Sequence, residues 1–230
     1  MVKKHGIYRS SSSNEIGLLC RLILFIEDVI EDAECSDIYV DRIDLDKFVL
    51  KPVNCKYDVN ESISIFRDRY EPIDICLGEA GSSYRALYDH VIEKYEETIH
   101  SYMKKIFRET YESGIEYFTG VTFDGRFFVL EGEEGYVKFP AIPHCLSIHT
   151  HPSLYPVPSS ADFKNIVRLI IDRGLGHVVV AGVSSIAIYR VKPLNIGEYE
   201  ELKKLISRDP ISILDYIRTK IGFLKIKYLP

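Results

Sequence analysis

The stretch that most constrains the fold is residues 147–162, which read SIHTHPSLYPVPSSAD. It begins in an apolar run typical of a buried strand and ends where an amphipathic helix begins. His149 and His151 are two residues apart, so on a strand they point to the same face, separated by about 7 Å along the chain. Two imidazoles on one face can converge on a single metal ion. The sequence therefore predicts a strand–loop–helix unit built around a metal site.

The loop of this unit is restricted by Pro152, Pro156 and Pro158 and leads to Ser159. Asp162 follows three residues later, in the first turn of the predicted helix, where its carboxylate can serve as a third ligand. Two histidines, one carboxylate and a water form the open four-coordinate arrangement typical of catalytic zinc. The same Ser-x-x-Asp spacing is also typical of a capping box, which needs no metal. Both interpretations stay open at this point.

The flanking sequence predicts alternating helices and strands. Apolar residues at steps of three and four predict one long helix over residues 83–111, and a second helix over 161–172. The segment EYFTGVTFDGRFFVLEG predicts a hairpin with its turn at Asp124 and Gly125. Further strands are predicted at YVKF (136–139), CLSIH (145–149), HVVVAG (177–182) and SIAIYRV (185–191), with helices from about 196 and 210.

The first 80 residues have a different character. Residues 1–13 are predicted to be a flexible start, followed by an amphipathic helix from Asn14. Short strands are predicted at DIYV (37–40), KFVLKPV (47–53), SISIF (62–66) and IDICL (73–77). Pro52 predicts that the second of these lies at a sheet edge. The glycine-containing segment 78–83 favours a division into an N-terminal α+β unit of unknown role (1–80) and a second domain (81–230).

The pattern H-x-H-x7-S-x2-D, with Pro152 after the second histidine, resembles the motif of the JAMM metalloproteases, the catalytic branch of the MPN-domain family. The resemblance covers residues 83–192, and the same run also resembles the RadC-like branch of that fold. It implies an α/β fold, an MPN and cytidine-deaminase-like layered arrangement of a mixed sheet flanked by helices. It further implies one zinc ion held by His149, His151 and Asp162, with Ser159 helping to stabilise the oxyanion.

The resemblance also implies an upstream glutamate that acts as general base. In the family it stands where the first long helix gives way to the first strand, and Glu116 occupies that place. The other glutamates suit the role less well: Glu96 and Glu97 lie inside the predicted long helix, and Glu131, Glu133 and Glu134 lie at a hairpin end, where a solvated turn is expected. The interval from Glu116 to His149 is shorter than in most members of the family. The implied reaction is hydrolysis of an isopeptide or peptide bond after the C-terminus of a ubiquitin-like modifier.

Composition limits the alternatives. A net charge of -5 gives no reason to expect a nucleic-acid partner. The apolar stretch IGLLCRLILFI (16–26) is short and contains Arg21, so we expect neither a membrane span nor a signal peptide. Five scattered cysteines without CxxC spacing argue against a disulfide framework and favour the cytoplasm.

Three expectations remain beside the peptidase. A scaffold MPN protein or a RadC-like protein without peptidase activity is the alternative function. The apolar seam of the 83–111 helix permits a homodimer. His144 and His177 have no partner at ligand spacing and are expected to be structural.

Overall fold

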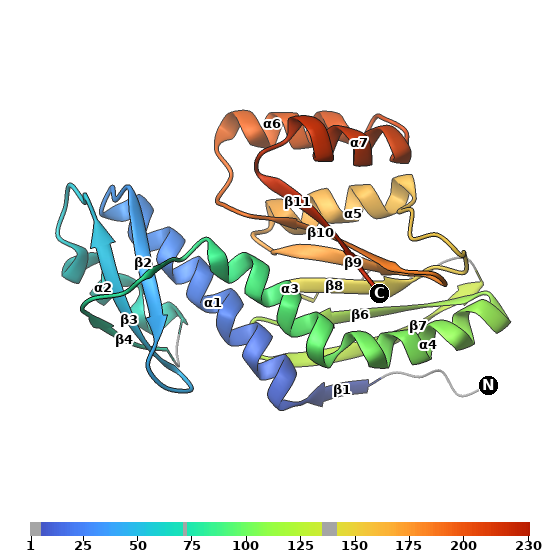
Figure 1. Cartoon of the computed structure of the whole chain (residues 1–230), viewed down its shortest axis with the longest axis horizontal. Coiled ribbons are helices and arrows are strands. Elements are labelled where there is room, and N and C mark those ends of the chain that lie inside the picture. Colours follow the sequence, from blue (N-terminus) through green and yellow to red (C-terminus); the bar gives the residue numbers. More distant parts are fainter. Residues whose placement is uncertain (1–5, 71–72, 135–141) are drawn as a thin grey trace. The chain divides into compact units, whose positions relative to one another are not determined.

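The structure is a computed structural model that describes residues 6–70, 73–134 and 142–230 (Figure 1). It divides into two compact units. One contains the N-terminal segment up to Gly17 together with the chain from Ile92 onward, and the other contains Leu18–Val91. The helices α1 (Ser11–Asp32) and α3 (Ala86–Thr98) contribute residues to both units.

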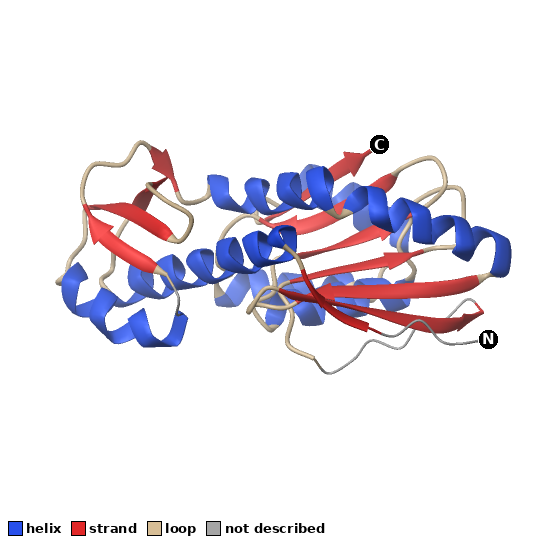
Figure 2. Ribbon diagram, turned by 90° about the horizontal axis from the view of Figure 1, so that it is seen from below, coloured by secondary structure: helices blue, strands red, loops and turns tan. Residues whose placement is uncertain are grey.

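The larger unit is built on a seven-stranded mixed sheet, whose strands run side by side (red in Figure 2). Its strands, in spatial order, are β1 (Gly6–Arg9), β7 (Arg126–Glu134), β6 (Ile115–Val121), β8 (Leu146–Thr150), β9 (Gly176–Val180), β10 (Ser185–Arg190) and β11 (Leu224–Leu229). Strands β8 and β9 pair in parallel, while the other neighbours in this sheet are antiparallel. The prediction of an α/β fold with a mixed sheet flanked by helices is confirmed.

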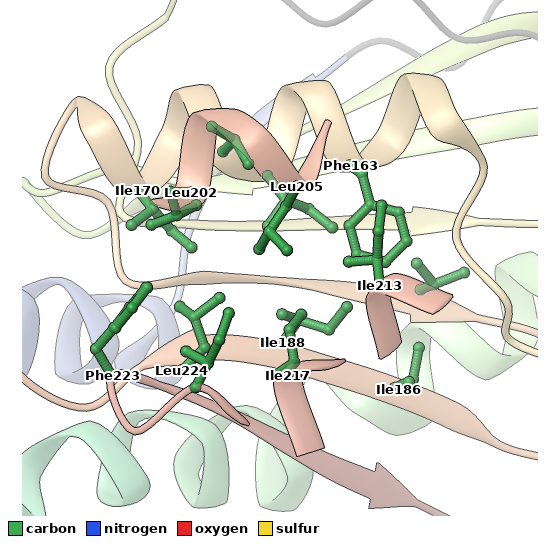
Figure 3. Close-up of a cluster of buried hydrophobic side chains, with 14 residues drawn as sticks. Phe163, Ile170, Ile186, Ile188, Leu202, Leu205, Ile213, Ile217, Phe223 and Leu224 are labelled. Atoms are coloured by element: carbon green, nitrogen blue, oxygen red, sulfur yellow. The ribbon is translucent and has the colours of Figure 1, made fainter. Parts of the chain in front are cut away.

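Helices cover both faces of this sheet (Figure 1). One face carries α4 (His100–Ser113), and the opposite face carries α5 (Ser160–Ile171), α6 (Ile196–Leu205) and α7 (Pro210–Lys220). The second face holds a core of buried aliphatic and aromatic side chains, among them Phe163, Ile188 and Leu202 (Figure 3). This packing fixes α5 against β9 and β10, and so fixes the place of its first turn.

Local chemistry explains most of these element boundaries. The turn between β6 and β7 contains Gly125 at φ 82°, a left-handed conformation that glycine adopts without a Cβ penalty. Helices α5, α6 and α7 are preceded by the N-cap residues Ser159, Asn195 and Asp209, and the side chain of each accepts a backbone hydrogen bond from the first turn. The hairpin, α5, α6 and α7 all lie where the sequence predicts them.

The smaller unit contains a four-stranded sheet in the order β4 (Asp74–Leu77), β3 (Lys47–Val53), β2 (Asp37–Arg42) and β5 (Ser82–Ser83). The prediction that residues 47–53 form an edge strand is wrong, because β3 lies between β4 and β2. Pro52 is tolerated because β4 pairs with β3 over Lys47–Leu50 and ends before the proline.

The predicted strand at residues 62–66 is also wrong. That segment belongs to α2 (Val59–Arg67), which is followed by a short 3₁₀ turn, η1 (Asp68–Tyr70). Asp58 caps α2 by accepting a hydrogen bond from the Asn60 N–H. Val59 and Ile63 are buried at helical spacing, whereas Ile65 is exposed. The alternation of serine and isoleucine in SISIF is therefore not the alternation of a half-buried strand.

Three further expectations are corrected. The start of the chain is not flexible over residues 6–13, because β1 pairs with β7 and α1 begins at Ser11. The long helix is two helices that break at Ile99, where the Thr98 hydroxyl bonds the carbonyl of Lys94 one turn earlier. Cys35 and Cys55 form a disulfide in the smaller unit, although the cysteine spacing suggested none.

The predicted strand at 136–139 lies outside the described residues. Among the described helices, none is long and apolar enough to cross a membrane. The two units divide at Gly17 and Ile92, whereas the sequence predicts a single boundary near residue 80. The N-terminal segment belongs to the larger unit because β1 pairs with β7.

Candidate metal centre

The site lies at the end of the central strand β8. This strand is buried and pairs with β6 on one side and β9 on the other. His149 and His151 point to the face that carries α5, while Thr150 between them points to α4. The sheet therefore holds both imidazoles on one face, as the strand periodicity predicts.

Asp162, in the first turn of α5, lies close to the two histidines. One ligand atom from each residue can be chosen so that all three atoms lie within 4.8 Å of one another. His149 Nε2 lies 3.5 Å from Asp162 Oδ1, and His151 Nε2 lies 3.8 Å from Asp162 Oδ2. Separations of this size suit a metal ion bound between the groups, since zinc–nitrogen and zinc–oxygen bonds are about 2.0–2.2 Å long.

The start of α5 is also a capping box. The Ser159 N–H donates to Asp162 Oδ2 at 2.6 Å, and the Asp162 N–H donates to Ser159 Oγ at 3.1 Å. The two interpretations of Ser-x-x-Asp are thus compatible in one conformation. The cap fixes the carboxylate of Asp162 while its Oδ1 faces His149.

The loop between the second histidine and α5 is held by backbone hydrogen bonds to the end of β9 and to the segment after it. The His151 N–H donates to the Val180 carbonyl, the Gly182 N–H to Ser153, and the Val183 N–H to Leu154. Leu154, Tyr155 and Val183 are nevertheless exposed. Exposed hydrophobic side chains therefore lie on the loop that follows His151 and on the segment hydrogen-bonded to it.

Glu116 enters the site from β6. It lies at an irregularity in the β6–β7 pairing, and its Oε1 is 3.9 Å from His151 Nε2. Burial, reinforced by the negative charge of Asp162, raises the pKa of Glu116 to about 7. The structure therefore brings together all five residues that the sequence singled out: His149, His151, Asp162, Glu116 and Ser159.

The other glutamates of the sequence analysis lie elsewhere. Glu131 and Glu134 stand opposite Tyr117 and Ile115 in the β6–β7 ladder. The carboxylate of Glu133 is exposed, close to the end of β7. Glu116 and Asp162, in contrast, each lie within 4 Å of a site histidine.

The charge states of His149 and Asp162 favour the binding of a cation. Burial lowers the pKa of His149 to about 4, so its ring is neutral at neutral pH and can offer a lone pair. Burial opposes ionisation of Asp162, but His149, His177 and the hydrogen bonds from Ser159 hold the pKa of this carboxyl below its ordinary value. Two imidazole nitrogens and one carboxylate form a donor set that fits zinc.

His177, expected to be merely structural, contacts the site. Its Nε2 lies 2.7 Å from His149 Nδ1, and its Nδ1 lies 2.6 Å from Ser147 Oγ. Sequence spacing does not indicate this contact, because it depends on the parallel register of β8 and β9, which places His177 beside Ser147. His144, in contrast, makes a hydrogen bond with the Ile142 carbonyl.

A buried hydroxyl network supports the site from the opposite face of the sheet. Thr150 Oγ1 lies 2.6 Å from Thr110 Oγ1 of α4 and accepts the Tyr117 N–H at 2.9 Å. Thr110 and Thr150 are both fully buried. The network ties α4, β8 and the start of β6 together next to Glu116.

We expect Thr150→Val to lower the free energy of unfolding by about 1–3 kcal/mol, because the buried Tyr117 N–H and Thr110 hydroxyl lose their partner. Urea unfolding measures the change. Thr219→Val is the control, since that hydroxyl is exposed on α7, and we expect a change within about 0.5 kcal/mol. A loss for Thr150→Val no larger than for the control contradicts a structural role for the network.

The fold and the site define a class of protein: a mixed α/β protein with a buried His-His-Asp group close enough to bind a metal ion. Comparison of the chain with family models, with curated proteins and with solved structures found no match. The function is therefore inferred from the site.

Proposed function

We propose that the protein is a zinc-dependent isopeptidase or peptidase of the JAMM type. The observation that carries the proposal is the convergence of His149, His151 and Asp162 with a fourth group, Glu116, whose carboxylate lies 3.9 Å from His151. Three ligands leave a fourth position open for water or substrate, which distinguishes catalytic from structural zinc sites. A buried carboxylate beside that open position suits a general base.

His149, His151 and Asp162 would hold the zinc ion, which would supply a coordinated water with a pKa of about 7 and polarise the substrate carbonyl. Glu116 then accepts the proton as water attacks the carbonyl and returns it to the leaving amine. One buried carboxylate can perform both transfers, because it accepts the proton as a base and returns it as an acid.

Ser159 contributes to the same step. Its Oγ accepts the Asp162 N–H, so its own hydroxyl hydrogen can be donated to the oxyanion that develops on the carbonyl. Ser159 is fixed at the start of α5, so the hydroxyl is positioned before substrate binds.

We propose conjugates of a ubiquitin-like modifier as substrates. The exposed side chains of Leu154, Tyr155 and Val183 offer an apolar surface beside the site on which an extended polypeptide can bind. The net charge of -5 disfavours a nucleic-acid substrate.

A cytoplasmic location remains part of the proposal. The protein has a Cys35–Cys55 disulfide, and disulfides are more common in proteins of oxidising compartments. Intracellular proteins of hyperthermophiles are the recognised exception, and the absence of glutamine and the abundance of charged residues fit such a source.

The test of function is a cleavage assay with fusions of small modifiers and with ubiquitin conjugates. We expect the zinc-loaded protein to release the modifier, to lose activity after chelation and to regain it when zinc is returned. Stoichiometric zinc without cleavage of any substrate contradicts the peptidase and favours a scaffold or RadC-like role. Cleavage that survives complete removal of the metal contradicts the zinc mechanism.

We also expect little preference among ubiquitin linkages. Strand β9 begins at Gly176, shortly after α5 ends at Ile171, so no separate loop follows Asp162 to grip a second modifier. Little binding energy remote from the reacting bond is then available to orient one particular lysine linkage. A panel of linkage-defined chains measures kcat/KM, and a strong preference for one linkage contradicts this prediction.

A further inference from the structure

Three buried polar side chains form a line that ends at the metal centre. Ser147 Oγ lies 2.6 Å from His177 Nδ1, and His177 Nε2 lies 2.7 Å from His149 Nδ1. All three residues are about 99% buried. Ser147 and His149 lie on the same face of β8, and the parallel register sets His177 of β9 directly beside Ser147.

The geometry restricts where the hydrogens lie. Two ring nitrogens 2.7 Å apart form a hydrogen bond only if one carries a hydrogen and the other offers its lone pair. A neutral imidazole carries one hydrogen, on either of its two nitrogens. The chain then has two directions, either from His149 through His177 to Ser147 or the reverse.

Only one direction suits a metal. His149 faces Asp162 through Nε2, so that nitrogen must be without hydrogen to bind a cation. Its hydrogen then lies on Nδ1 and is donated to His177 Nε2. His177 in turn carries its hydrogen on Nδ1 and donates it to Ser147 Oγ. The reverse direction places a hydrogen on His149 Nε2 and blocks the ligand.

We propose that His177 is a positioning residue, which holds His149 in the tautomer and ring orientation that bind the metal, with Ser147 fixing the tautomer of His177. A hydrogen bond of this kind also makes the ligating nitrogen more basic. The inference rests on the metal site of the proposed function, and it is independent of the substrate. His177 is not a catalytic residue, because it reaches the site through His149.

The first test is zinc affinity, measured by competition with a chromogenic chelator. We expect His177→Phe, which keeps a ring but removes the acceptor, to weaken zinc binding by about 10–100-fold. His177→Gln places a carbonyl oxygen close to the position of Nε2, and we expect it to restore most of the affinity. Ser147→Ala removes the outer link alone, and we expect a smaller loss than His177→Phe.

His100→Phe is the matched control. His100 is also buried in the larger unit and contacts a serine, Ser185, through one ring nitrogen, but it lies on α4 outside the ligand group. We expect it to bind zinc as the wild type does. The thermal midpoint of each variant separates loss of affinity from loss of fold. Unchanged affinity in folded His177→Phe, or an equal loss in folded His100→Phe, overturns the proposal.

The second test determines which ring nitrogens carry hydrogen. In the zinc-loaded protein, nitrogen-15 NMR of the histidine rings should show His177 protonated on Nδ1 and unprotonated on Nε2. A hydrogen on His177 Nε2 overturns the proposal even where the protein is an active peptidase. Zinc binding without peptide cleavage contradicts the proposed function and leaves these readouts intact, whereas failure of the wild type to bind zinc overturns both.

Discussion

Asp162→Ala and His149→Ala are each expected to reduce bound zinc from one ion per chain to far below that value. Asp162 Oδ1 and His149 Nε2 lie 3.5 Å apart, so either change removes one of the three groups that converge at the site. The remaining two ligands cannot complete the three-ligand set of a catalytic zinc site. Elemental analysis of purified protein after dialysis measures the effect.

The control must separate the metal from the helix cap. Asp162→Ala also removes the carboxylate that accepts the Ser159 N–H, which costs about 1 kcal/mol of stability. Asp162→Asn keeps an acceptor oxygen for the cap, so we expect it to fold as well as the wild type and still bind zinc more weakly. Asp172→Ala removes an exposed carboxylate at the other end of α5 and should leave zinc unchanged. Stoichiometric zinc in both Asp162→Ala and His149→Ala contradicts the ligand assignment.

Glu116→Gln is expected to lower kcat by at least about 10²-fold while zinc content and thermal stability stay close to the wild-type values. Glutamine preserves the size of the side chain but cannot accept and return the proton, and a lost acid–base group costs about 10²–10⁴-fold. Single-turnover cleavage of a modifier fusion, with zinc measured on the same sample, gives both quantities.

Glu131→Gln is the matched control. Glu131 lies in β7 opposite Tyr117, one position along from Glu116 in the ladder, so the change removes a nearby carboxylate outside the group of ligands. We expect this variant to retain activity. An active Glu116→Gln together with an inactive Glu131→Gln shows that the general base was assigned to the wrong carboxylate.

The candidate site could be predicted from the sequence because its parts are local. His149 and His151 depend on the period of one strand, and Asp162 depends on the start of the next helix. The Asp124–Gly125 turn is equally local, and it was also predicted correctly. Glu116 required the additional knowledge carried by the family resemblance.

What could not be predicted depends on contacts between distant segments. His177 reaches His149 only through the β8–β9 register, and β1 belongs to the large sheet only through its pairing with β7. The Cys35–Cys55 disulfide joins two segments of the smaller unit, and the spacing of the cysteines in the sequence does not indicate that these segments are neighbours. Residues 62–66, which belong to α2, are wrongly predicted to be a strand because period two and period 3.6 are hard to separate over five residues.

The most direct test of the account is a crystal structure of the zinc-loaded protein with anomalous diffraction recorded at the zinc absorption edge. The account predicts one strong anomalous peak about 2.0–2.2 Å from His149 Nε2, His151 Nε2 and a carboxylate oxygen of Asp162, with a water in the fourth position next to Glu116. A map with no peak among these three residues, or with the zinc bound only elsewhere on the chain, contradicts it.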